Sequence, residues 1–587
     1  MSVELKMKEK LSQLLHELYQ NSVAVDSIKL ESTNEDFIGD FTFVVFPYVR
    51  FSRKSPEQTG HEIGSALQTL MPEIKSFNCV KGFLNIELND HYWLTEIKNN
   101  QPAKTQNPQT ILIEYSSPNT NKPLHLGHIR NNLLGYSVAE ILNAYGHQVK
   151  KINLINDRGI HICKSMLAWK LFGNNETPES SGLKGDHLVG KYYVLFDKHY
   201  KEEINVLISK GMTEEDAKKK APIFEQAQEL LRKWENGDKE TMELWKTMNA
   251  WVYAGFDVTY KKLGVNFDQY YYESNTYILG KDIIEEGLSK QVFYKKEDGS
   301  VWINLTEEGL DEKLVLRSDG TSVYITQDIG TADLKHKEFN FDKSVYVVGN
   351  EQDYHFKVLF LILKKLGKSW ADGCYHLSYG MVDLPSGKMK SREGTVVDAD
   401  DLMQEMHETA KEKTEELGKT DGFSEDEKSA LYDAIGMGAL KFFMLKVDPQ
   451  KRMLFNPADS IDMQGDTGPF VQYTYARIQS LLKVANYTAS SNLNLSIDLL
   501  ESEKKLVVEL LQYDKELKVA ADNYIPSIIA NYCLKLAKAF NRLYNDAPFV
   551  REENEDKKQL RLYLGHKTAT TIKTCLQLMG IHAPERM

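Results

Sequence analysis

One stretch in the first third of the chain switches between the apolar spacing of a strand and that of a helix. The run ILIEY at 111–115 is short and apolar. From Leu126 to Leu142 apolar residues recur every three or four positions, and Gly146 then offers a stop. The run KINLI at 151–155 repeats the strand pattern. This order predicts two parallel strands joined by a crossover helix.

Two further apolar runs, SVYITQ at 322–327 and SVYVVG at 344–349, extend the same pattern. With the helical segments between them they predict an α/β fold, in which a Rossmann-like, doubly wound parallel sheet occupies about 106–400. The charged stretch from about 197 to 245 has a helical period. We expect it to form a helical insertion in that central domain.

The two ends of the chain have different patterns. Residues 1–105 mix helix-period and strand-like runs, and a polar segment at 98–110 with two prolines follows as a linker, so an N-terminal α+β domain is expected. After about 400 no strand pattern recurs. A helical connecting segment is therefore predicted for 401–460 and an α-helical bundle for 461–587.

Composition limits the function classes. The 587-residue chain is 42% hydrophobic and 27% charged, as in ordinary soluble proteins, and no window reaches the roughly 20 apolar residues of a membrane span. Its five cysteines include no C-x-x-C pair, which argues against a zinc ribbon or a disulfide framework. We expect a cytoplasmic protein without membrane contact. The net charge of −12 argues only weakly against nucleic-acid binding, because a local basic patch suffices.

The decapeptide NTNKPLHLGH at 119–128 lies between the first predicted strand and its helix. This is the carboxyl edge of a parallel sheet, where open α/β folds bind ligands, and a helix N-terminus there favours phosphate. Pro123 stiffens the loop, and Gly127 leaves room for a flat ring such as adenine. His125 and His128 are three residues apart and can point the same way. A nucleotide site is predicted; surface histidines near a turn are the alternative.

A second cluster lies at 384–397, in LPSGKMKSREGTVV. Lys388, Lys390 and Arg392 stand beside Ser391 in a glycine-containing loop. Cationic side chains of this kind can neutralise charge on a reacting phosphate. The alternative is a solvated basic turn.

Taken together, these motifs resemble those of class I aminoacyl-tRNA synthetases, and within that class the arginyl-tRNA synthetases. The similar segments are EYSSPNTNKPLHLGHIRNN, INDRGIH, DHLVGKYY, YITQDIGTA, GNEQDYHF, GKMKSREG, GPFVQYTYARI and MGIHAPERM. The resemblance runs from about residue 110 to the C-terminus, and GDF and KGFLNIEL extend it into the first hundred residues. The second class signature usually reads K-M-S-K-S, whereas this chain has K-M-K-S. The family implies that Lys122 replaces the missing cation.

The resemblance implies ATP-dependent ligation of L-arginine to tRNA(Arg) through an arginyl-adenylate, with release of AMP and pyrophosphate. ATP and Mg²⁺ are the expected cofactors; the ion sits on the β and γ phosphate oxygens, and no side chain is expected to ligate a metal. The cationic and donor groups expected to stabilise the transition state are Lys122, His125, His128, Lys388 and Lys390. The expected nucleotide-binding residues are Gly127, His125, His128, Lys388, Met389 and Ser391.

Recognition of arginine requires a carboxylate that can accept two parallel N–H bonds from a guanidinium group. The family motifs carry this role to Asp328, at the end of the strand predicted for 322–327. Tyr324, on the same strand face, and Gln352 would flank it. Asn119 and Asp157 would hold the α-amino end. In the duller interpretation, Asp328 caps a helix, Tyr324 is core and Gln352 is a loop residue.

The C-terminal bundle resembles the family's anticodon-binding domain. The run FVQYTYAR at 470–477 offers rings for unstacked bases, with Arg477 near phosphate, although Phe470, Tyr473 and Ile478 at helical spacing also fit a core. By the same resemblance the N-terminal domain contacts the outer corner of tRNA, and the protein is a monomer. The rival interpretations are another class I synthetase, a small nucleotidyltransferase, and a tRNA-binding relative without catalysis.

Overall fold

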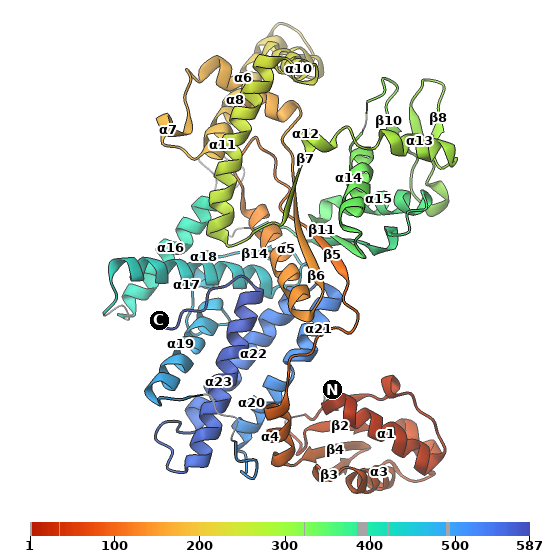
Figure 1. The fold of residues 1–587 in the computed structure, drawn as a ribbon, viewed down its shortest axis with the longest axis vertical. Coiled ribbons are helices and arrows are strands. Elements are labelled where there is room, and N and C mark those ends of the chain that lie inside the picture. Colours follow the sequence, from red (N-terminus) through yellow and green to blue (C-terminus); the bar gives the residue numbers. More distant parts are fainter. Residues whose placement is uncertain (1–2, 35, 322, 384–396, 419–421, 489–492) are drawn as a thin grey trace.

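The central element is a five-stranded, wholly parallel sheet (Figure 1). The computed structural model describes residues 3–34, 36–321, 323–383, 397–418, 422–488 and 493–587. The sheet has the order β12-β11-β5-β6-β7. Its strands are β5 (Thr110–Glu114), β6 (Gln148–Ile155), β7 (Gln269–Tyr272), β11 (Lys343–Gly349) and β12 (Cys374–Tyr379). In this order β11 and β12 lie on one side of β5, and β6 and β7 lie on the other. The strand order therefore reverses between β5 and β11, and such folds bind ligands at that position.

Helices cover both faces of the sheet, so the predicted doubly wound α/β fold is confirmed. Ile111 and Ile113 of β5 pack into the hydrophobic cluster that includes α5 (Leu126–Tyr145). Leu112, which points to the other face, joins the cluster that includes α14 (Tyr324–Phe339) and α15 (Asp353–Lys365). The helix α5 ends at Gly146, whose φ of 105° places it in the left-handed region, as the sequence predicted.

The strand predicted for 322–327 is wrong, because Tyr324 begins the helix α14. The alternation of apolar residues there is short enough to fit a helix as well. Ile325 and Ile329, four residues apart, are buried on one face of α14, and that helical burial decides the conformation. A small antiparallel sheet of order β10-β9-β8 lies between α13 (Lys281–Ser289) and α14. Its strands are β8 (Tyr294–Lys295), β9 (Val301–Ile303) and β10 (Lys313–Leu316).

A long helical region separates β6 from β7 and forms the upper part of Figure 1. The predicted insertion at 197–245 lies within it, but the region begins earlier and ends later than that. Its helices are α6 (Ile160–Phe172), α7 (Pro178–Ser181), α8 (Gly185–Ser209), α9 (Glu214–Lys220), α10 (Pro222–Glu235) and α11 (Lys239–Leu263). The short helix α12 (Glu273–Thr276) follows β7 directly.

The N-terminal region is α+β, as predicted, and lies at the lower right of Figure 1. Its antiparallel sheet has the order β1-β2-β4-β3, with strands β1 (Leu30–Ser32), β2 (Phe41–Val44), β3 (Ile74–Val80) and β4 (Phe83–Leu88). Its helices are α1 (Val3–Tyr19), α2 (Val49–Ser52), α3 (Pro56–Leu70) and α4 (Asp90–Asn99). The end of α4 touches the C-terminal bundle, where Tyr563 donates a hydrogen bond to the Ile97 carbonyl at 3.2 Å.

In the described residues after 397 the chain is helical, as predicted, with one exception. The two-residue strand β14 (Met453–Leu454) pairs in parallel with β13 (Val382–Asp383), so the expectation of no strand after 400 is wrong. The helices are α16 (Ala399–Glu416), α17 (Glu425–Lys446), α18 (Pro457–Ser460), α19 (Gly468–Val484), α20 (Glu501–Leu511), α21 (Tyr513–Asn523), α22 (Pro526–Asp546) and α23 (Glu555–Leu578). Within the described residues, no helix is long and apolar enough to cross a membrane.

Candidate active site

Two histidines close the first turn of α5 through reciprocal hydrogen bonds. His125 is the N-cap, and its Nδ1 accepts from the Gly127 N–H at 3.1 Å. His128 Nδ1 accepts from the His125 N–H at 3.2 Å, which completes a capping box. Since each Nδ1 is an acceptor, the ring proton of each neutral imidazole must lie on Nε2.

Burial keeps both imidazoles neutral. It lowers the pKa of His125 to about 4, with a further contribution from the Lys122 charge. The pKa of His128 is lowered well below its ordinary value, first by burial and then by His125 and Lys122. Burial also lowers the pKa of Lys122. The loop therefore offers two fixed, uncharged Nε2–H donors beside one ammonium group.

Two glycines permit the close packing around this loop. A Cβ on Gly127 would lie 3.0 Å from Cε1 of His125, so a side chain there would press on the imidazole. A Cβ on Gly190 of α8 would lie 2.8 Å from Cδ of Pro123. The segment DHLVGKYY thus begins a helix that packs against the histidine loop.

The loop leaves β5 through an unusual turn. Ser116 and Ser117 have φ of 77° and 45°, a conformation that costs free energy for residues with a side chain. Asn131 of α5 compensates, since its Oδ1 accepts from the Ser116 N–H at 2.5 Å. Asn119 then forms an isolated parallel bridge with Asn156, just past β6, and its side chain is exposed. The turn therefore places Asn119 at the carboxyl edge.

The second cationic cluster, Lys388, Met389, Lys390 and Ser391, lies outside the described residues. The segment that follows it is tied to the histidine loop. Val397 O accepts from the Leu126 N–H at 2.9 Å, and the Ala399 N–H donates to Leu124 O at 2.9 Å. The chain thus returns from the cluster to the first turn of α5.

Arg130 ties the preceding segment to the same helix. Its guanidinium is fully buried and donates to the carbonyl of Gly380 at 2.8 Å and to that of Lys451 at 2.9 Å. Gly380 lies just before β13, the last described strand ahead of the cluster. Both flanks of the cluster therefore lie beside α5.

The residues expected to recognise arginine lie on the helices α14 and α15. Tyr324 and Asp328 are one turn apart at the start of α14, and Tyr324 is 75% exposed, so a core role for it is wrong. Val323 is the N-cap, which removes the capping role considered for Asp328. The Asp328 Oδ2 accepts from His355 Nε2 at 2.6 Å. Gln352 is exposed at the start of α15.

Asp157 is enclosed by the chain itself. Its carboxylate is buried and accepts from the Ser274 N–H at 2.8 Å, the Ser274 hydroxyl at 2.7 Å and the Tyr253 hydroxyl at 2.9 Å. Burial raises its pKa despite these hydrogen bonds. Asp157 thus fixes the segment that follows β7.

With this geometry established, comparison with known proteins identifies the family. The family model described as tRNA synthetases class I (R), catalytic domain, matches residues 93–456, and the DALR anticodon binding domain matches 471–587. Arginine–tRNA ligase of Flavobacterium psychrophilum is 54% identical and that of Bacteroides thetaiotaomicron 53% identical, each over 100% of both chains. The chain belongs to the arginine–tRNA ligase family. The arginyl-tRNA synthetase structure of Thermus thermophilus, 24% identical, has a TM-score of 0.80 and covers 100% of both chains, which shows a common fold.

Two residues at this synthetase site were missed by the sequence analysis. His355 lies three residues after Gln352 in the quoted segment GNEQDYHF, so a signal was present. For Glu273, the first residue after β7, the sequence carried no such signal, because an acidic residue after a short strand is common. Burial raises the pKa of Glu273 to about 7, against the effect of Arg158.

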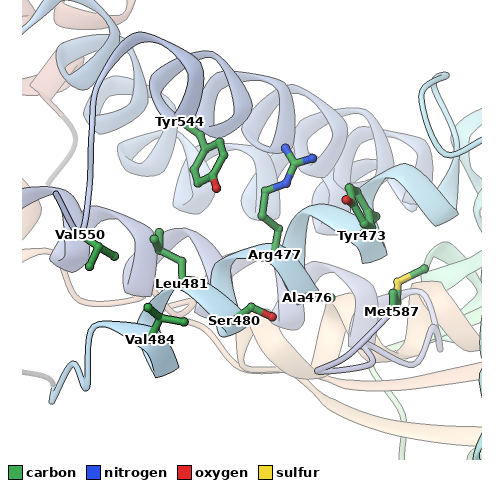
Figure 2. A pocket seen from close by; sticks show the side chains of 9 residues that line it. All are labelled: Tyr473, Ala476, Arg477, Ser480, Leu481, Val484, Tyr544, Val550 and Met587. Carbon is green, nitrogen blue, oxygen red and sulfur yellow. The ribbon is translucent and has the colours of Figure 1, made fainter. Parts of the chain in front are cut away.

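The C-terminal bundle of this synthetase carries a separate cavity of about 450 Å³ (Figure 2). The guanidinium carbon of Arg477 lies 4.8 Å from the Tyr473 ring centroid and 5.3 Å from that of Tyr544. Ile478 is core, as the alternative interpretation expected, whereas Tyr473 lines the cavity. The lining residues are Tyr473, Ala476, Arg477, Ser480, Leu481, Val484, Tyr544, Val550 and Met587.

Proposed function

We propose that this chain activates L-arginine with ATP and transfers it from arginyl-adenylate to tRNA(Arg), releasing pyrophosphate and AMP. The proposal is supported by two neutral histidine donors at the start of α5 and by an accessible carboxylate at the start of α14, two helices that pack on the same sheet. The substrate carboxylate is already ionised at neutral pH, so the reaction needs no nucleophilic side chain and no general base. It needs positioning and stabilisation of phosphate charge.

The histidine side of the site would bind ATP. The Nε2–H groups of His125 and His128 are preorganised donors for phosphate oxygens, and such donors act at no cost of reorganisation. Lys122 would add positive charge, together with Lys388 and Lys390. Gly127, Met389 and Ser391 would complete the nucleotide site. The segment 119–128 contains no carboxylate, so Mg²⁺ would be held by phosphate oxygens and water.

The α14 side would bind arginine. The Asp328 Oδ2 already accepts from His355, which orients the carboxylate and leaves Oδ1 for a guanidinium N–H. Tyr324 and Gln352 flank this position. Asn119 lies across the sheet edge, where it would meet the α-amino end. Asp157 would help to bind the α-amino end of arginine indirectly, because it holds the segment around Ser274 in place.

The outer domains would bind tRNA. In the region proposed as the anticodon-binding domain, 461–587, the cavity under Tyr473 and Arg477 combines an aromatic ring with a cation, a suitable seat for an unstacked base. In the region 1–105 Phe46 and Phe83 are 50% and 45% exposed and meet edge to face, which suits contact with the tRNA corner. The helices of 401–460 would connect the catalytic region 106–400 to the bundle. We propose a cytoplasmic monomer.

Pyrophosphate exchange measured with each of the twenty amino acids, with and without tRNA(Arg), tests this proposal. Among the amino acids, we expect exchange with arginine only, in the presence of tRNA(Arg), and aminoacylation of tRNA(Arg). Exchange with a different amino acid would identify another class I specificity. Binding of tRNA without exchange under either condition would identify a non-catalytic relative and overturn the proposal.

A further inference from the structure

A group of charged side chains joins the helical insertion to the first turn of α16. Lys184, at the start of α8, donates to the Asp400 carboxylate and also to the hydroxyl of Thr259 on α11, the latter at 2.6 Å. The Thr259 hydroxyl in turn donates to Asp400 Oδ1 at 3.0 Å. His187 Nε2, from the first turn of α8, lies 3.0 Å from Asp400 Oδ2. Two helices of the insertion therefore hold Asp400 through three side chains.

Burial and charge make these contacts stronger than ordinary surface ion pairs. Burial alone would raise the pKa of Asp400, but the hydrogen bonds from His187 and Lys184 outweigh it and lower that pKa to about 2. Asp186 is fully buried, and its carboxylate lies 3.2 Å from Lys184 Nζ. Asp398 places a further carboxylate 3.6 Å from His187 Nε2. Since hydrogen bonds between charged groups withdrawn from water are strong, we expect this group to fix the first turn of α16 in position.

The first turn of α16 is itself joined to the histidine loop. Residues 397–399 run antiparallel to residues 124–126, and Asp398 lies opposite His125 in an isolated bridge. Two backbone hydrogen bonds of 2.9 Å flank this bridge. Asp398 also caps α16, since its Oδ1 accepts from the Asp400 N–H at 2.8 Å. A displacement of Asp400 would therefore be passed through Asp398 to the backbone of His125.

We propose that Lys184 and His187 are positioning residues for the nucleotide side of the site. From α8 they hold the first turn of α16, and that turn fixes the backbone around His125. The His125 imidazole accepts a hydrogen bond from the Gly127 N–H of the same turn, so it moves with this backbone. This inference rests on the proposed function, since it assumes that His125 donates to ATP.

The rest of α16 is anchored independently of the charged group. Leu402, Met403 and Met406 are buried in the largest hydrophobic cluster of the described residues. The helix should therefore stay folded when the charged group is weakened. The loss should appear in the placement of its first turn, and hence in catalysis more than in stability.

Pyrophosphate exchange by the full chain with arginine, ATP and tRNA(Arg) tests the inference. In His187→Ala, kcat should fall by about 3- to 30-fold, because misplacement of a catalytic group by about 1 Å can cost about 10²-fold. The KM for arginine should stay within about twofold of the wild-type value, since the residues expected to bind arginine lie on α14 and α15. His187→Gln keeps a side-chain N–H that can donate to Asp400 and should recover most of kcat.

A double-mutant cycle tests the path through Asp400. Lys184→Met and Asp400→Asn should each lower kcat. The double variant should lose less than the product of the two single losses, because either change alone already breaks the bond between the two residues. Single losses that multiply in the double variant would show that the two residues act independently and would overturn the inference.

Two matched controls lie on the same helices. Lys191→Met removes an α8 ammonium group that pairs with Glu176 at 2.8 Å, and His407→Ala removes an α16 imidazole that pairs with Asp433 at 2.8 Å. Both should keep the wild-type kcat. Thermal unfolding of every variant shows whether the fold is intact, and if Lys184→Met does not fold, the two His187 variants decide.

An unchanged kcat in His187→Ala, or an equal loss in His187→Ala and His187→Gln, would overturn the inference and leave the proposed function standing. A rise in KM for arginine with kcat unchanged would also overturn it, because the charged group would then act on the arginine side. Failure of the wild-type chain to catalyse exchange with any amino acid would overturn the proposed function, and the inference with it.

Discussion

The two sides of the site are built in different ways. On the histidine side, the described groups Lys122, His125, Gly127 and His128 all lie on one loop, and the imidazoles are fixed by hydrogen bonds to backbone groups two or three residues away. On the arginine side, Asp328, His355 and Glu273 come from three separate elements. The first side is a locally capped helix end, whereas the second exists only when α12, α14 and α15 pack together. Variants on the two sides should therefore fail in different ways.

The largest effect is expected for Asp328→Ala. Removing the carboxylate leaves the guanidinium without its main partner, and loss of one member of such a pair costs about 2–5 kcal/mol. We expect kcat/KM for arginine in pyrophosphate exchange to fall by roughly 30- to 4000-fold. The Kd for ATP should stay near the wild-type value, and Asp333→Asn on the same helix should leave arginine activation intact. A normal KM for arginine in Asp328→Ala would show that Asp328 does not bind the guanidinium group and that the α14 side is not the arginine side of the site.

His125→Asn should give the opposite pattern. Asparagine is a good N-cap, so the start of α5 and the stability of the fold should persist, but the Nε2–H donor is lost. Loss of one preorganised donor typically lowers kcat by about 10²–10³-fold. The Kd for arginine should be unchanged. Equal losses in arginine affinity and in kcat would show that the histidine loop also shapes the amino-acid site.

The buried histidines also make stability depend on pH. The folded pKa of His125 is about 4, below the ordinary 6.5, so the unfolded chain binds a proton that the folded chain does not. Stability is therefore full above about pH 6.5 and is lost as the pH falls toward 4. Between pH 7 and 5 the free energy of unfolding should drop by about 2 kcal/mol on account of His125 alone.

Urea unfolding of the wild-type chain and of His125→Asn at the two pH values checks this. The variant should lose about 2 kcal/mol less than the wild type over that interval. An identical loss in both would mean that His125 is exposed and charged, contrary to the neutral donor on which the ATP side depends.

The smallest effect is expected for Gly127→Ala. The new Cβ would lie 3.0 Å from Cε1 and 3.2 Å from Nδ1 of His125, so the imidazole must shift by a few tenths of an ångström. Misplacement of a catalytic group by about 1 Å can cost 10²-fold, so a loss of roughly 3- to 10-fold in kcat is expected. Steady-state pyrophosphate exchange measures it. A rise in KM for arginine with kcat unchanged would show that Gly127 belongs to the arginine side of the site.

The sequence predicted the fold class, and it placed His125 and His128 correctly at the start of the helix that follows β5. The spacing of apolar residues in β5, α5 and β6 matches the period of a strand or of a helix, because those residues are buried against neighbouring elements. Gly146 ends α5 as expected. The first turn of α5 follows from residues within hydrogen-bonding reach along the chain. Predictions for Lys388 and its neighbours remain untested, because they lie outside the described residues.

The same kind of apolar pattern gave a wrong prediction at 322–327, where a strand was expected. Val323 and Ile325 alternate as in a strand, yet Ile325 also pairs with Ile329 on a helical face, and six residues do not separate the two patterns. Packing of α14 against the sheet decides in favour of the helix. The structure therefore places Tyr324 and Asp328 on a helix and not on the predicted strand, and their role in arginine recognition stays a prediction.

By itself, then, the sequence determined what depends on nearest neighbours along the chain: the crossover unit, the capped helix start and the position of the ring protons that follows from it. The tertiary structure decided which distant carboxyl groups meet. Asp157 is closed by Ser274 and Tyr253, whereas Glu273, near Asp328, has no hydrogen-bond partner among the described residues. Neither outcome can be read from spacing, because burial and hydrogen-bond satisfaction depend on segments more than a hundred residues apart.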